Sequence, residues 1–117
     1  MRRYENIVII SPDCKKEEED ELLSRIKTGL EKAGANVIRM DDWGVRRFAY
    51  PIRRNDKGHY LFFLLDMDEN GVGTLNRFYK NIDLILRHMI VGVDEKYLGP
   101  EKPPEQVVFD ELEGEFV

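Results

Sequence analysis

The order in which strand and helix patterns follow one another is the feature that most constrains what this chain can fold into. Short apolar or alternating runs predict strands over residues 4–10, 36–52, 59–67 and 84–93, the second of them interrupted at 41–44. Apolar residues at helical spacing predict helices over about 15–33 and from 68 to about 82, and Gly34 stands where a helix C-terminus prefers glycine. The sequence therefore predicts six elements in the order βαββαβ.

This order is that of the ferredoxin-like sandwich, an α+β domain with two helices on one face of a four-stranded antiparallel sheet. Asn55–Gly58 has the composition of a hairpin turn between the two middle strands, and Pro51 marks an edge strand or a break in pairing. Residues 99–117 are acidic and rich in proline. We expect this stretch to be a flexible tail, because it has too little apolar surface to order itself.

The strand predicted over 59–67 is apolar on both of its faces. Two sets of large apolar residues alternate along it, one set being Tyr60, Phe62 and Leu64 and the other Leu61, Phe63 and Leu65. A sheet with helices on one face ordinarily has polar residues on the other. The pattern therefore indicates that something covers the second face. A protein or RNA partner is the favoured cover, and loops or the tail of the same chain are the alternative.

Charge is distributed unevenly along the chain, which has a formal net charge of −5. The last 24 residues, from Asp94, hold eight acidic residues against two lysines, so the preceding residues are close to neutral. Within that body, the stretch 44–58 contains five basic residues (Arg46, Arg47, Arg53, Arg54 and Lys57) against Asp56 alone. A local basic surface on an acidic protein is typical of a binding site.

Several kinds of function find no support in the sequence. Asp66–Gly71 matches the start of a calcium-binding loop, but the twelfth position, which needs a bidentate Glu, is Arg77. His59, His88 and Cys14 lack the spacing of a metal site, and no nucleophile–base pair or phosphate-binding glycine loop is present. We therefore expect no enzyme activity, metal, cofactor or small-molecule substrate. Without a membrane-spanning run or a signal peptide, a cytoplasmic location is expected.

The basic stretch 44–54 interleaves arginines with aromatic residues. Guanidinium groups match phosphate oxygens, and aromatic ring faces stack on unpaired bases. Arg2, Arg3 and Arg87 lie in or beside the first and last strands, which share the predicted sheet. The residues alone therefore leave RNA binding and a solvated basic face about equally open.

Four segments closely resemble the bacterial small-subunit ribosomal protein six family: Met1–Glu5, Gly44–Ile52, Lys57–Tyr60 and Arg87–Val91. The resemblance covers roughly residues 1–98, which we take as the domain. It implies a structural ribosomal protein that binds the central domain of 16S ribosomal RNA together with small-subunit ribosomal protein eighteen.

The resemblance also implies roles for particular residues. The basic family positions expected near RNA correspond to Arg2, Arg3, Arg46, Arg47 and Arg87. The face available to the protein partner corresponds to Tyr60, Phe62 and Leu64 of the sheet. Tyr97, which matches an aromatic family position just after the last strand, is expected to belong to the same face.

Two other interpretations remain open. An RNA-recognition motif would stack single-stranded RNA on its sheet, but Lys57-Gly58-His59-Tyr60 fits the RNP1 pattern poorly. A ferredoxin-like regulatory module, which binds a metabolite or dimerises through its sheet, would explain the apolar face but would leave the arginines without a role.

Overall fold

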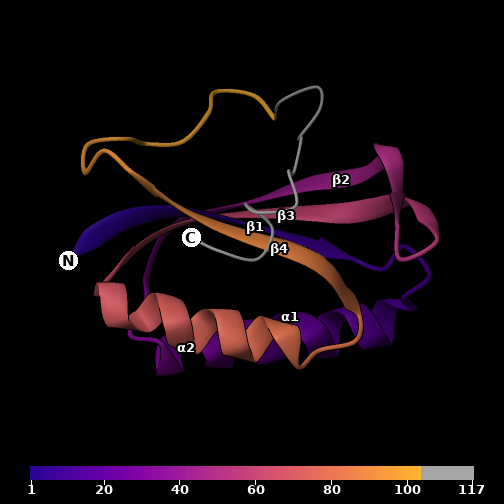
Figure 1. Ribbon diagram of the computed structural model, residues 1–117, viewed down its shortest axis with the longest axis horizontal. Helices are drawn as coiled ribbons and strands as arrows, with labels where there is room; N and C mark the ends of the chain where they lie inside the picture. Colours follow the sequence, from indigo (N-terminus) through magenta and orange to yellow (C-terminus); the bar gives the residue numbers. More distant parts are fainter. Residues whose placement is uncertain (104–117) are drawn as a thin grey trace.

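The sheet of the computed structural model, which describes residues 1–103, has the strand order β2-β3-β1-β4, with every neighbouring pair antiparallel. The elements are β1 (Arg2–Ile10), α1 (Lys16–Lys32), β2 (Asn36–Ile52), β3 (Asn55–Met67), α2 (Glu69–Lys80) and β4 (Ile85–Val93). Both helices lie on one face of the sheet, and the segment after β4 crosses the other face (Figure 1). The predicted order and the predicted layers of a ferredoxin-like sandwich are confirmed. No helix within residues 1–103 is long and apolar enough to cross a membrane.

Each helix begins where carboxylates can satisfy backbone amides. At α1, the Glu18 carboxylate accepts a hydrogen bond from the Lys15 amide (3.2 Å), and the acidic residues of the first turn suit the positive end of the helix dipole. At α2, the Asp68 side chain accepts from the Asn70 amide (2.9 Å) as an N-cap. The stretch that matched the start of a calcium loop therefore ends a strand and starts a helix.

The β2–β3 hairpin turns two residues earlier than predicted. Ile52 pairs with Asn55, so the turn consists of Arg53 and Arg54, whose φ angles are 49° and 67°. A two-residue hairpin turn favours left-handed conformations at both central positions, because these match the twist of the strands. The predicted turn at Asn55–Gly58 was wrong. Asn55 instead supports the turn by donating to the Arg53 carbonyl (3.1 Å).

β2 is an edge strand that continues through the predicted interruption at 41–44. Its pairing with β3 shifts register between Asp42 and Gly44, where Gly44 has a φ of +76°. Such a bulge adds a residue to one strand without ending the ladder, and glycine takes the left-handed position at no steric cost. Two further shifts lie between Val37 and Arg39 and between Arg47 and Ile52, the latter in the stretch that contains Pro51. β2 therefore remains one long edge strand through the polar stretch 41–44, where the sequence predicted an interruption.

The face of the sheet covered by the helices holds the larger of two apolar clusters. It joins alternate residues of β1 and β3 with the apolar stripes of both helices, among them Val8, Leu61, Phe63, Leu65, Leu22, Ile26, Leu75 and Tyr79. These side chains are buried, so this cluster is the core predicted from the periodicity of the sequence.

One polar side chain, Asn6, lies fully buried beneath the helices. Its Oδ1 accepts a hydrogen bond from the Tyr79 hydroxyl (2.5 Å), and its Nδ2 donates to the Met89 carbonyl (3.0 Å). A buried amide is tolerated when both of its polar groups have partners. Asn6 therefore occupies the position where the strand alternation calls for an apolar residue.

The face of the sheet away from the helices holds the second cluster. Its buried members are Ile7, Ile9, Trp43, Ile52, Tyr60, Phe62 and Leu64. The Trp43 ring stacks on Phe62 with ring centroids 5.0 Å apart and planes within 10°, while Phe48 and Tyr97 pack against the margin. Parts of the same chain therefore cover much of this face.

Candidate RNA and protein interface

The predicted protein-partner residues on β3 lie on the expected face but are not exposed. Tyr60, Phe62 and Leu64 have 2%, 0% and 0% of their surface accessible. Burial also raises the pKa of the Tyr60 hydroxyl. These residues form the floor of the face and give a partner no surface to touch in this conformation. Their role in partner binding stays a prediction that requires the cover above them to move.

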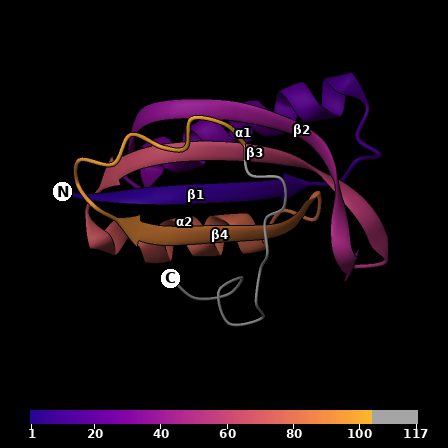
Figure 2. The ribbon, with the colours of Figure 1, turned by 90° about the horizontal axis from the view of Figure 1, so that it is seen from above.

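Besides Trp43 and Phe48 of β2, the cover includes residues 94–103, called here the strap, which run back across the sheet after β4 (Figure 2). The strap begins with a turn in which the Asp94 side chain accepts from the Lys96 amide (2.8 Å) and the Asp94 carbonyl accepts from the Tyr97 amide (3.0 Å). Residues 99–103 of the predicted tail belong to this strap. The rest of that tail, 104–117, lies outside the described residues.

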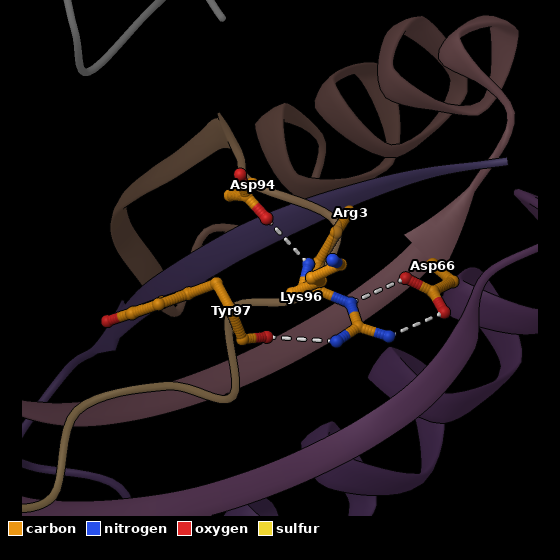
Figure 3. A network of polar contacts seen from close by, with 5 residues as sticks. All are labelled: Arg3, Asp66, Asp94, Lys96 and Tyr97. Carbon is orange, nitrogen blue, oxygen red and sulfur yellow. Dashed lines mark hydrogen bonds and ion pairs between the residues drawn. The ribbon is translucent and has the colours of Figure 1, made fainter.

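Arg3 holds the start of the strap (Figure 3). Its Nε and Nη2 donate to the two carboxylate oxygens of Asp66 (2.9 and 3.0 Å), and its Nη1 donates to the Tyr97 carbonyl (2.9 Å). Hydrogen bonding from the Arg3 guanidinium holds the pKa of Asp66 below its ordinary value. Only 14% of the Arg3 side chain is exposed. The Arg3 guanidinium is therefore occupied by the strap and by β3, and its RNA contact stays a prediction.

Arg39 holds the next part of the strap in the same way. From β2 it pairs with both oxygens of Asp41 (3.1 and 2.6 Å) and donates to the carbonyls of Leu98 (3.0 Å) and Pro100 (2.8 Å). Its guanidinium carbon lies 5.9 Å from the centre of the Phe62 ring, within the range of a cation–π contact. Sequence reasoning missed this role, because Arg39 lies outside the basic stretch and some 60 residues from the carbonyls that it binds.

Gly99 allows the strap to approach Arg39 so closely. Its φ is +96°, and a Cβ at this position would lie 2.7 Å from Arg39 Nη1 and 3.4 Å from the Phe62 ring. A side chain there would collide with the arginine and strain the backbone. Glycine at position 99 therefore allows the strap to pack closely over this face of the sheet.

Arg46 and Arg47 lie on the β2–β3 hairpin but face different ways. Arg46 lies over the Trp43 ring (guanidinium carbon to ring centre, 5.9 Å), and its Nε donates to the Trp43 carbonyl (3.3 Å). Arg47 is exposed, and as the next residue of the strand it alternates to the opposite face. Arg46 thus lies at the margin of the covered face, and Arg47 projects away from it.

The remaining predicted RNA contacts lie at opposite ends of the sheet. Arg2 pairs with Met67, and Arg87 pairs with Ile9, so β1 separates them by most of its length. Arg2 is exposed and lies 3.5 Å from the Glu69 carboxylate. Arg87 lines a hollow together with Arg53 of the hairpin turn. The structure therefore joins Arg87 to the basic hairpin and leaves Arg2 apart.

His59 lies between two carboxylates from different elements. Its Nε2 is 2.6 Å from an Asp42 oxygen, and its Nδ1 is 3.2 Å from a Glu19 oxygen. These three side chains form a group that could hold a metal ion among the described residues. The two carboxylates meet different nitrogens of the His59 ring. No spacing in the sequence could reveal the group, because its members are 17 to 40 residues apart.

His88 lies under the helices rather than on the surface. It is 6% exposed, and its Nε2 is 3.0 Å from Asn76 Oδ1 of α2. Burial, with a smaller contribution from the nearby Lys80, lowers the pKa of His88 to about 4. The imidazole is therefore neutral near pH 7 and serves as a satisfied sheet residue.

Fold and surface together define a class of protein: a ferredoxin-like module with a basic hairpin beside a covered apolar sheet face. The family model for Ribosomal protein S6 matches residues 3–92. The chain belongs to this family of small-subunit ribosomal proteins, as its curated relatives also show.

Two of those relatives are each called small ribosomal subunit protein bS6. That from Caldanaerobacter subterraneus subsp. tengcongensis is 33% identical over 95 residues, and that from Thermoanaerobacter pseudethanolicus is 36% identical over 95 residues. Both alignments cover 81% of this chain and all of the relative. The crystal structure of 30S ribosomal protein S6 from Thermotoga maritima matches with a TM-score of 0.74 at 28% identity, covering 79% of this chain and 87% of that one.

Membership of the family settles the general function. The chain is a component of the small ribosomal subunit, with the ribosome and its RNA as partners and a ribosomal, cytoplasmic location. The family is one of structural ribosomal proteins rather than enzymes.

Proposed function

We propose that this chain binds the central domain of 16S ribosomal RNA jointly with small-subunit ribosomal protein eighteen. The observation that carries the proposal is the run of ring contacts from Arg46 to Trp43 to Phe62. It joins the basic hairpin to the covered apolar face, so RNA and a protein partner bound at these two places would lie side by side.

The RNA side of the proposal rests on the hairpin. Its five basic residues stand against Asp56 alone, and Arg47, Arg53, Arg54 and Lys57 are exposed. Arginine forks on such a ribbon suit phosphate oxygens, which supply most of the affinity of a nucleic-acid complex. Arg87 extends the basic surface from the hairpin onto β4, whereas Arg2 lies apart at the other end of β1.

The argument for a protein partner rests on the incomplete cover of the sheet face away from the helices. The Trp43 Nε1–H is buried without an acceptor among residues 1–103, and such a buried donor costs about 1–3 kcal/mol. Leu98 of the strap is 70% exposed, and Val45 at the margin is 57% exposed. A partner that packs on the strap, or takes its place, would bury these apolar side chains and could supply the missing acceptor.

Burial argues against the RNA-recognition alternative. That motif stacks bases on exposed rings of the sheet, whereas Tyr60 and Phe62 are covered. The structure therefore favours contact with the RNA backbone by the hairpin over stacking on the sheet.

The test measures binding to a central-domain fragment of 16S RNA, with and without protein eighteen, over a range of salt concentrations. We expect tight binding only with the partner, and a steep fall as salt rises. The double variant Arg46→Glu/Arg47→Glu should weaken binding by at least about tenfold and flatten the salt dependence by about one unit for each phosphate that is no longer bound. The matched control Arg25→Glu/Lys27→Glu reverses two exposed charges on α1 and should bind as the unaltered protein does.

A second variant, Leu98→Asp, tests the protein side without disturbing the buried floor. It should weaken capture of protein eighteen while leaving the fold intact, because Leu98 is largely exposed. Equal RNA binding by the unaltered protein and both variants would contradict the proposal, as would full affinity for RNA without the partner.

A further inference from the structure

A polar hollow of about 230 Å³ lies between the tip of the β2–β3 hairpin and the start of β4. Arg53, Lys80, Arg87 and His88 supply its polar lining. These residues come from three separate parts of the chain: the hairpin turn, the end of α2 and the middle of β4. The hollow therefore exists only in the folded domain.

Arg53 closes the hollow by fixing the hairpin tip. Its Nη1 donates to the carbonyls of Asp83 (3.3 Å) and Ile85 (3.0 Å) in the connection between α2 and β4. Figure 2 shows the hairpin bending at one end of the sheet toward the start of β4. This anchoring uses one nitrogen of the guanidinium and brings a third positive charge beside Lys80 and Arg87.

Three cations, Arg53, Lys80 and Arg87, line this one hollow. Within residues 1–103, no carboxylate lies within ion-pair distance of Arg53, Lys80 or Arg87. Lys80 also suits the negative end of the α2 dipole, but that effect explains neither arginine. The positive field reaches the buried imidazole, since Lys80 helps to lower the pKa of His88. Like charges gathered around a hollow are favourable when an anion occupies it.

We propose that this hollow binds one phosphate group of the RNA backbone, an inference that rests on the proposed function. Guanidinium and ammonium donors suit the oxygens of a phosphodiester. Arg54 and Lys57 are exposed on the adjoining hairpin, so the positive surface continues beyond the hollow as a backbone-tracking strip would. Arg53 acts as a positioning residue that holds the tip, while Lys80 and Arg87 supply the charge.

The first experiment compares Lys80→Gln/Arg87→Gln with a matched control, Arg25→Gln/Lys27→Gln on α1, in binding to the 16S central-domain fragment with protein eighteen present. The first variant should lose about tenfold in affinity and about one unit of salt dependence, as expected for one phosphate contact. The control should match the unaltered protein. Unchanged binding by Lys80→Gln/Arg87→Gln overturns the inference.

The second experiment follows the backbone amide resonances of residues 83–88 as inorganic phosphate replaces chloride at constant ionic strength. Saturable shifts in the unaltered protein that vanish in Lys80→Gln/Arg87→Gln support a discrete phosphate site. If phosphate does not shift these resonances, the inference is overturned even if the variant binds RNA more weakly. The weaker binding would then reflect the lower net positive charge rather than a discrete phosphate site. Shifts without any change in RNA binding also overturn it, since the hollow would then hold free phosphate alone.

The outcomes separate this inference from the proposed function. If Arg46→Glu/Arg47→Glu abolishes RNA binding while Lys80→Gln/Arg87→Gln leaves it intact, the function stands and the phosphate hollow does not. If neither variant changes RNA binding, both proposals fail.

Discussion

The two faces of the sheet are both apolar and both buried, but they are covered by different means. On one face, two helices lay continuous apolar stripes on the strands. On the other, the cover consists of Trp43 and Phe48 from the edge strand and of a strap held by two arginines. The first cover is a layer of two helices, and the second is made of a few side chains and a segment without helix or strand structure.

The difference separates a core held by two helices from the face that we propose for a protein partner. The helix layer cannot leave without unfolding the domain, because the larger apolar cluster is buried between it and the sheet. The strap is attached through a few polar contacts, which contribute modestly and exchange readily with water or a partner. Burial alone therefore does not distinguish a permanent core from a replaceable cover.

The largest expected effect comes from a matched pair of adjacent residues in β3. Leu64 and Leu65 are both fully buried, but Leu64 belongs to the strap side and Leu65 to the helix side. Leu65→Ala should lower the free energy of unfolding by about 3–5 kcal/mol, because the helices cannot collapse into the cavity. Leu64→Ala should cost about 2 kcal/mol, because the thin cover can settle. Urea denaturation measures both, and an equal or larger loss for Leu64→Ala would contradict the distinction between the faces.

Acid should weaken the helix-covered face through His88. Its folded-state pKa of about 4 lies below the ordinary value of 6.5, so the unfolded chain takes up a proton first as the pH falls. The neutral His88 imidazole contributes fully to the free energy of unfolding above pH 6.5. This contribution falls progressively toward pH 4, by up to about 3 kcal/mol in total. Denaturation midpoints across this window should fall steeply.

The matched variant for this acid prediction is His88→Asn, which removes the titrating group but keeps a polar side chain near Asn76. Its stability at pH 7 should be lower, and its dependence on pH between 6.5 and 4 should be flatter. An identical acid profile for both proteins would assign the effect to other groups.

The smallest effect on global stability is expected from releasing the strap. Arg39→Gln removes the paired contacts with Asp41 and with the carbonyls of Leu98 and Pro100. The unfolding midpoint should barely move, whereas hydrogen exchange of the Tyr97 amide should speed up by about tenfold. Arg25→Gln on α1 is the control. A large fall in global stability would mean that the strap belongs to the core, which would remove the contrast between the faces.

The fold could be predicted because the spacing of apolar residues is visible within each strand or helix, without knowledge of tertiary contacts. The sequence also predicted the two-sided character of β3, since Tyr60, Phe62 and Leu64 alternate with a second apolar set. It missed the turn at Arg53-Arg54, because those residue types are uncommon in left-handed conformations. Their placement depends on pairing across the hairpin and on contacts with residues 83 and 85.

The site was harder to predict than the fold for a similar reason. Residue type alone does not distinguish Arg3, Arg39 and Arg46. In the structure, Arg3 and Arg39 bind backbone carbonyls of the strap, whereas Arg46 lies over the Trp43 ring. Which cation remains available to RNA is decided by partners many residues away. Composition located the basic stretch 44–58, and only tertiary contacts showed which arginines hold the strap.

The strap is bound through its backbone. Arg3 and Arg39 donate to the carbonyl oxygens of Tyr97, Leu98 and Pro100, and every amino acid carries such an oxygen. These backbone contacts therefore do not depend on which side chains the strap carries, apart from the glycine at position 99. Over evolutionary time the strap's outward side chains are free to follow changes in a neighbouring molecule while its path across the sheet is preserved.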